Sequence, residues 1–318
     1  MSDFGNIFRC PECKSDISKS MISDNKILCL CSAEYPIIAG VPDFLDTLNE
    51  ESVEIKLDRI NKSFSNQWSM FKYEGEYKTW DWDIKSRLLL FFKEMDMSPS
   101  KLNQKNLLDA GCGNGVLTSA LTRFGCKTVG IDISDSVFRA KRECEDVENA
   151  SLIFVKGSLT NPPLRDKSFD YIYSSGVLHH NKNTKEALEA VLPLLKDDGK
   201  IYVWLYRKRI IQILYAEPLR KITVHLPSEL MDGFTYLLAY PFQLMRKINN
   251  AFRGRTYVDY SIDELQLSLH DTFSPTYVNQ HDEEELLDWF KKNGLNFSKI
   301  TKRERQGFGI VGSRKELV

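Results

Sequence analysis

The sequence lacks a long apolar run, since no stretch reaches the roughly 18 to 20 apolar residues that span a bilayer. The first ten residues, MSDFGNIFRC, lack the basic start and apolar segment of a signal peptide. We therefore expect a cytoplasmic location. The chain also lacks a basic excess, because its formal net charge is −1. This argues against a surface built mainly to bind nucleic acid, although a local basic patch would not show in the total.

Seven cysteines are present, and four of them fall within the first 31 residues. In a reducing compartment disulfides are the weaker interpretation. Cys10 and Cys13 form a CxxC pair, and Cys29 and Cys31 form a tighter CxC pair. Two short-spaced pairs supply the four soft ligands of a tetrahedral zinc site. Residues 1–48 are therefore expected to form a zinc-ribbon-like module with a structural zinc; the alternative is two reduced cysteine pairs without metal.

Residues 49–104 are expected to be a linker and a helical cap. Several aromatic residues fall here, and each either caps a ligand or packs against the core: Trp68, Tyr73, Trp80 and Trp82.

From residue 105 onwards, apolar strand patterns alternate with helical ones. Strands are expected at NLLDAG, KTVGIDIS, SLIFVKG, SFDYIYSSG and GKIYVWLY, with helices near 116–124 and 135–147 and at TKEALEAVLPLLK. A second part, 261–318, adds a helix ending near Gly294 and a closing strand pair. This pattern predicts an α/β fold: a doubly wound, mainly parallel, Rossmann-like sheet of seven strands.

Residues 205–260 interrupt this pattern as an expected helical lid. They hold nine Lys or Arg against four Asp or Glu, together with apolar stretches such as FTYLLAYPFQLM. Such a lid could form an acceptor pocket or contact a membrane surface peripherally. An ordinary helical subdomain or a dimer contact is the alternative.

The stretch LLDAGCGNG follows the first strand of the 105–204 core and carries Gly111, Gly113 and Gly115. A carboxylate, Asp109, precedes the first glycine by two residues. It would repel a pyrophosphate and suits a ligand with a positively charged amine, such as S-adenosylmethionine. Asp132 ends the next strand, where an acidic side chain can accept hydrogen bonds from a ribose diol.

Residues 105–204 resemble a class I S-adenosylmethionine-dependent methyltransferase of the group that includes the ubiquinone-biosynthesis methyltransferases. The similar motifs are LLDAGCGNG, GIDIS, GSLTNPPLRDKSFDYIYSSGVLHH and LPLLKDDGKIYVW. The resemblance implies S-adenosylmethionine as cofactor. It also implies cofactor contacts from Asp109, Gly111, Gly113, Asp132, Ile133, Ser158, Leu159 and Ser175. Ser158 stands where the group usually has an aspartate beside the adenine.

Methyl transfer to a hydroxyl or amine requires a base, and histidine is the usual one near neutral pH. His179 and His180 follow the fourth strand and are the candidate catalytic residues; their alternative role is to shape the pocket. Asp271, Tyr277 and His281 form a second polar group that either contacts substrate or caps a helix.

Three functions follow from these observations. The first is N- or O-methylation of a small molecule such as a sugar, lipid or secondary metabolite. The second is an RNA base methyltransferase whose zinc module holds RNA, which the absence of basic excess in the first 60 residues disfavours. The third is a non-catalytic cofactor-binding protein. The intact glycine and acidic motifs argue against it, because a protein without catalytic activity has no need to keep them.

Overall fold

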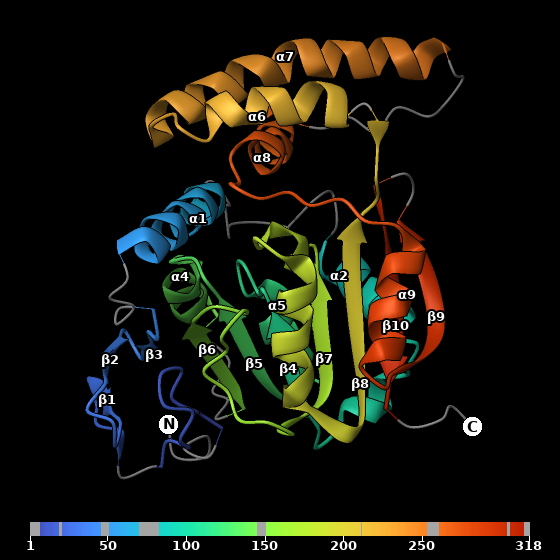
Figure 1. The fold of residues 1–318 in the computed structure, drawn as a ribbon. Coiled ribbons are helices and arrows are strands. Elements are labelled where there is room, and N and C mark those ends of the chain that lie inside the picture. The colour runs from blue at the N-terminus through green and yellow to red at the C-terminus, as the bar shows by residue number, and fades with distance from the viewer. Residues whose placement is uncertain are drawn as a thin grey trace.

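The computed structural model describes residues 7–18, 21–45, 51–69, 83–144, 151–210, 212–252, 261–303 and 306–314. Within these residues it forms a small N-terminal sheet, a large central sheet with helices on both faces, and a helical layer above one edge of that sheet (Figure 1).

The N-terminal sheet has three antiparallel strands in the order β1-β2-β3. Their bounds are β1 Lys26–Leu28, β2 Glu34–Ile38 and β3 Val41–Pro42.

The central sheet has seven strands in the order β6-β5-β4-β7-β8-β10-β9. The first five are parallel, and β10 is antiparallel to both of its neighbours. The predicted doubly wound sheet of seven strands is thus confirmed. Its strands are β4 Asn106–Ala110, β5 Lys127–Asp132, β6 Leu152–Lys156, β7 Phe169–Ser175, β8 Leu195–Tyr206, β9 Asn296–Arg303 and β10 Gly307–Ser313.

Alternate side chains of the central strands point to opposite faces, and both faces are buried. Leu108, Ile201 and Val203 pack with helices α5 and α9 on one face, whereas Leu107 and Tyr202 pack with α2 and α3 on the other. Burial on both sides is the usual condition of parallel strands. The helices are α1 Glu51–Ser69, α2 Ile84–Met95, α3 Val116–Thr122, α4 Ser136–Glu143, α5 Thr184–Val191, α6 Glu217–Thr223, α7 Ser228–Phe252, α8 Ile262–Phe273 and α9 Glu283–Lys292. Shorter helical segments are η2 Pro99–Leu102, η3 Leu178–His180, η4 Leu192–Leu194 and η5 Gln212–Ala216.

The helices of the 205–260 segment lie above the carboxyl edge of the central sheet, with α1 and α8 between α7 and that edge (Figure 1). Helix α8 lies beyond residue 260, yet its Leu265 and Leu269 pack against Ala239 of α7. The helical layer therefore contains helices from the 205–260 segment and also α8, which follows that segment in the chain. None of the helices in the described ranges is long and apolar enough to cross a membrane.

Candidate cofactor site, active site and metal centre

The loop between β4 and α3 requires glycine for two reasons. The φ angles of Gly111 and Gly113 are 90° and 52°, in the left-handed region that favours glycine. A Cβ on Gly111 would lie 2.2 Å from a Val177 methyl carbon, and one on Gly113 would lie 2.5 Å from the Trp68 ring. The amide of Gly111 donates to the carbonyl of Ile131 at 2.8 Å, which holds the loop against β5.

The carboxylate of Asp132 lies directly beside this loop. Its Oδ2 accepts from the Gly113 amide at 2.9 Å, and its Oδ1 accepts from the Ser134 amide at 2.9 Å and hydroxyl at 2.7 Å. Burial raises the pKa of Asp132, and these hydrogen bonds partly oppose that rise. Because an ionised carboxylate has about four lone-pair sites, it retains capacity for a ligand hydroxyl.

The carboxyl of Asp109 is buried on the other side of the loop, with 5% of the residue exposed. Its Oδ2 accepts a 2.6 Å hydrogen bond from the Thr118 hydroxyl. Burial raises the pKa of Asp109 to about 6, against the opposing effects of the Thr118 hydrogen bond and the Arg87 charge. Among the described residues it has no ion-pair partner within 4.0 Å. A cationic ligand group would relieve the cost of this buried charge.

Helix α1 brings Trp68 onto the glycine loop. The Ser65 hydroxyl accepts from the Asp135 amide at 2.8 Å, and Arg139 donates to the carbonyls of Trp68 at 3.4 Å and Ser69 at 3.1 Å. These contacts fix the end of α1 above α4. The other three aromatic candidates lie outside the described residues: Tyr73, Trp80 and Trp82.

The segment after β6 reaches the same place. The Gly157 amide donates to the Asp132 carbonyl at 2.9 Å. Ser158 and Leu159 are buried beside it, and the Ser158 hydroxyl lies 2.8 Å from that of Thr160. Ile133 is half-buried on the adjoining loop. The residues expected to contact a nucleoside therefore lie together next to Asp132.

The two histidines of η3 have different surroundings. His179 is fully buried, and neither ring nitrogen has a hydrogen-bond partner among the described residues. The Nδ1 of His180 lies 2.9 Å from the Tyr277 carbonyl, so this nitrogen must donate, which leaves the Nε2 of a neutral ring with a lone pair. That Nε2 is 4.0 Å from Asp271, whose other oxygen accepts the Tyr206 hydroxyl.

Burial lowers the pKa of both histidines, very strongly for His179. For His180 the negative charge of Asp271 partly offsets this effect. Asp271 and Tyr277 thus lie beside the histidines. His281 lies at the start of α9, which Asp282 caps through the Glu285 amide at 3.1 Å. His281 itself bonds Thr184 at 2.8 Å.

A half-buried arginine that the sequence did not single out holds Ser175. Arg303 of β9 donates to both carboxylate oxygens of Glu94, at 2.6 and 2.7 Å. It also donates to the Ser175 hydroxyl at 2.8 Å and to the Tyr173 hydroxyl at 3.2 Å. Glu94 is 1% exposed. Nothing in the sequence pairs these residues, because 209 positions separate Arg303 from Glu94.

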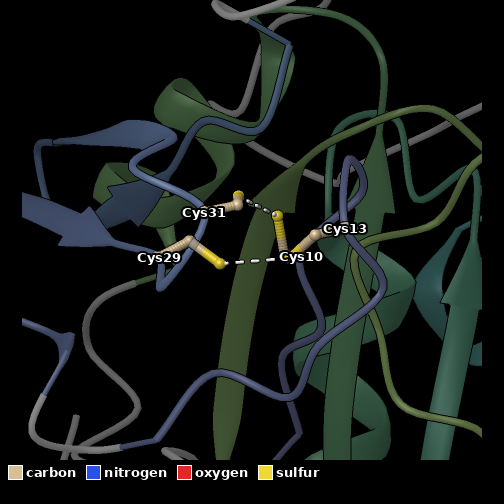
Figure 2. Close-up of side chains that lie close together, drawn as sticks. All are labelled: Cys10, Cys13, Cys29 and Cys31. Atoms are coloured by element: carbon tan, nitrogen blue, oxygen red, sulfur yellow. Dashed lines mark hydrogen bonds between the residues drawn. The ribbon is translucent and has the colours of Figure 1, made fainter.

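The four N-terminal cysteines converge on one point (Figure 2). All four sulfur atoms lie within 4.8 Å of one another. The Cys10–Cys31 sulfur distance is 3.7 Å and the Cys13–Cys29 distance is 3.5 Å. In a tetrahedral site with Zn–S bonds of about 2.3 Å, the sulfurs are about 3.8 Å apart. The donor set and spacing therefore fit zinc.

The cysteine module is attached to the segment that follows Leu159. The Arg9 amide donates to the Pro163 carbonyl at 3.1 Å, and the Arg165 amide donates to the Ile7 carbonyl at 2.9 Å. The Asn161 side chain donates to the Pro11 carbonyl at 3.0 Å. The tetrapeptide Asn161–Leu164 therefore joins the module to the central domain.

Comparisons with known proteins match this arrangement. Residues 108–203 match the family model described as a methyltransferase domain. These residues form a class I S-adenosylmethionine-dependent methyltransferase domain. The methyltransferase domain contains the glycine loop, Asp132, Ser158 and both candidate histidines.

Two curated relatives are both named mitochondrial ubiquinone biosynthesis O-methyltransferase. The chain is 26% identical over 158 residues to the one from Schizosaccharomyces pombe, covering 45% of this chain and 57% of that protein. It is 29% identical over 147 residues to the one from Dictyostelium discoideum, covering 42% of this chain and 46% of that protein. The chain therefore spans about half the length of these relatives.

Among solved structures, the magnesium protoporphyrin IX methyltransferase from Synechocystis PCC 6803 with bound SAH aligns with 84% of this chain and 100% of its own. The sequence identity is 15% and the TM-score is 0.49.

Proposed function

We propose that the whole chain is an S-adenosylmethionine-dependent methyltransferase that methylates a hydroxyl group of a small molecule. The observation that carries this proposal is the pair of buried carboxylates, Asp109 and Asp132, on either side of a glycine loop. The charge of Asp109 disfavours a pyrophosphate and suits an amine, and the Asp132 carboxylate suits a ribose diol. The two relatives named as O-methyltransferases support oxygen as the acceptor atom.

Each part of the site then has a task. Asp132 accepts from the ribose hydroxyls, Asp109 pairs with the α-amino group, and the Ser158–Leu159 backbone and Ile133 contact the adenosine. Ser175 contributes from the end of β7, held by Arg303. Trp68 covers the glycine loop and excludes water. The cofactor supplies an electrophilic methyl group carried on a sulfonium.

In this proposal His180 removes the acceptor's proton. Its Nδ1 is fixed by the Tyr277 carbonyl, and its lowered pKa keeps the ring neutral near pH 7. Its free Nε2 receives the proton, and Asp271 stabilises the imidazolium that results. His179, which has no polar partner among the described residues, packs beside it and fixes its ring. Zinc bound by Cys10, Cys13, Cys29 and Cys31 is structural, because four thiolates leave no open coordination position.

Cofactor binding is tested by calorimetry with S-adenosylhomocysteine. Asp132→Ala should weaken binding at least about tenfold, because it leaves ribose hydroxyls without a buried acceptor. Asp135→Ala removes a more exposed carboxylate three residues away and is the matched control. Equal affinities for both variants and the unaltered protein would place the cofactor elsewhere.

The acceptor class is tested with cofactor labelled on its methyl group. Protein, labelled cofactor and a cell extract are incubated, and RNA, protein, lipid and small polar fractions are separated. Label in the lipid or small polar fraction that disappears with Asp132→Ala supports the proposal. Label in RNA would instead favour a role for the cysteine module in holding RNA.

A further inference from the structure

Helix α7 has two apolar faces, and only one of them is used inside the protein. On the inner face, Met231, Thr235 and Ala239 follow one another at intervals of four residues and are buried. Ala239 packs with Leu265 and Leu269 of α8. An ordinary surface helix presents polar residues on its opposite face.

The opposite face of α7 is instead apolar and exposed. We call its residues the outer stripe: Leu230, Leu237, Leu244, Ile248 and Phe252. Their exposed fractions run from 48% to 88%. Spacings of seven, seven, four and four residues place them on one line along a helix. At 1.5 Å per residue the outer stripe is about 33 Å long. Tyr236, Tyr240 and Met245 beside it are also exposed.

Glu229 and Asp232 flank the first residue of the outer stripe, and the charges beside its other residues are basic. From Gly233 to Phe252 the helix contains Arg246 and Lys247 and no Asp or Glu. Residues 205–260 hold nine basic and four acidic residues, although the whole chain holds 43 and 44. An apolar helix face flanked by basic residues and tyrosines is the pattern of a helix that lies in an anionic membrane surface. A second copy of this chain would bring the same basic excess to a symmetric contact, and like charges would oppose it.

We propose that the outer stripe of α7 binds the surface of a bilayer containing anionic phospholipid, with the helix axis in the plane of that surface. The basis is the exposed apolar line and the basic excess of residues 205–260, so the proposal does not depend on the methyl-transfer activity. Since α1 and α8 lie between α7 and the carboxyl edge of the sheet (Figure 1), docking in this way would turn that edge toward the lipid.

Vesicle flotation of the full chain tests the proposal. The vesicles are phosphatidylcholine alone or phosphatidylcholine with about one third phosphatidylglycerol. We expect binding to the anionic vesicles, weaker binding at high salt and little binding to the neutral ones. The double variant Leu237→Gln, Leu244→Gln should lower the partition coefficient at least about thirtyfold, because it removes two large apolar side chains from the lipid contact.

The control is Leu89→Gln on α2, since Leu89 and Leu237 are 72% and 71% exposed. It makes the same chemical change on another surface and should leave binding unaltered. A second pair, Leu230→Gln with Ile248→Gln, gives the same test if the first variant unfolds.

Three results would overturn the proposal. One is that the protein binds neither kind of vesicle. Another is equal binding to both kinds, because the proposal requires a preference for the anionic lipid. The third is a dimer in analytical ultracentrifugation that the Leu237→Gln, Leu244→Gln variant dissociates, because a second copy would then cover the outer stripe.

Discussion

Replacing Asp109 with Asn should stabilise the cofactor-free protein, and the gain in unfolding free energy over the unaltered chain should increase as the pH rises. Asp109 is buried beside the glycine loop, and its pKa is raised from 3.8 to about 6. Asparagine has a similar shape and keeps an oxygen that accepts the Thr118 hydroxyl. It does not ionise, so it removes the cost of a buried charge while leaving the local packing in place.

The magnitude follows from the two pKa values. Well below pH 3.8 the carboxyl is protonated in the folded and unfolded chains, and its ionisation costs no stability. As the pH rises the unfolded chain loses this proton first, so the folded state is progressively disfavoured until the pH passes about 6. The full effect is about 3 kcal/mol of unfolding free energy. Roughly 2 kcal/mol of it falls between about pH 4.5 and about pH 7.5.

Urea unfolding of both proteins at these two pH values measures the effect. The stability of Asp109→Asn minus that of the unaltered chain should increase by roughly 2 kcal/mol toward the higher pH. Asp135→Asn, which removes a more exposed carboxylate, is the control. Saturating S-adenosylhomocysteine should stabilise the unaltered protein more than the variant, because the variant lacks the proposed pairing of the ligand's amine with Asp109. A stability difference independent of pH would refute the assigned burial cost.

Three further predictions concern other parts of the molecule. Elemental analysis of the unaltered protein should show about one zinc per chain, and Cys13→Ser should remove most of it. Calorimetry of this variant should also show weaker S-adenosylhomocysteine binding, because the cysteine module holds the segment after Leu159. Arg303→Met should cost about 3–5 kcal/mol in urea unfolding by leaving Glu94 buried without its counter-ion, and adding Glu94→Met should recover much of that loss. His180→Gln should lower kcat about 10²–10⁴-fold without changing cofactor affinity. The kcat of the unaltered enzyme should fall at acid pH with an apparent pKa below 6.5, because burial lowers the pKa of His180.

The parts of the fold that the sequence predicts well are those encoded locally. The strand ending in Asp109 and the one ending in Asp132 are short apolar runs followed by polar or glycine residues, and parallel strands bring their ends to one edge. The cysteine pairs are also local, with two and one intervening residues. In each case a few neighbouring residues determine both the backbone shape and the chemistry.

The parts that escaped prediction depend on contacts between distant segments. The ion pair of Arg303 with Glu94 joins β9 to α2, and both residues look like ordinary surface charges in the sequence. The contact of Tyr277 with His180 is of the same kind, because an irregular segment supplies a backbone carbonyl that no side-chain pattern marks. Helix α8 follows the 205–260 segment in the chain, but its packing against α7 appears only in three dimensions.

The attachment of the cysteine module also affects the edge of the central sheet that β6 forms. Strand β6 is at one side of that sheet, and Asp43, directly after β3, forms a parallel bridge with Lys156. The Phe44 amide donates to the Lys156 carbonyl at 2.9 Å, and the side chains of Asp43 and Lys156 form an ion pair at 3.0 Å. An unpaired strand edge is a template for pairing with other chains. The N-terminal module therefore covers the end of β6 at Lys156, and a truncated chain that begins at the methyltransferase domain would leave this end open to pairing with other chains.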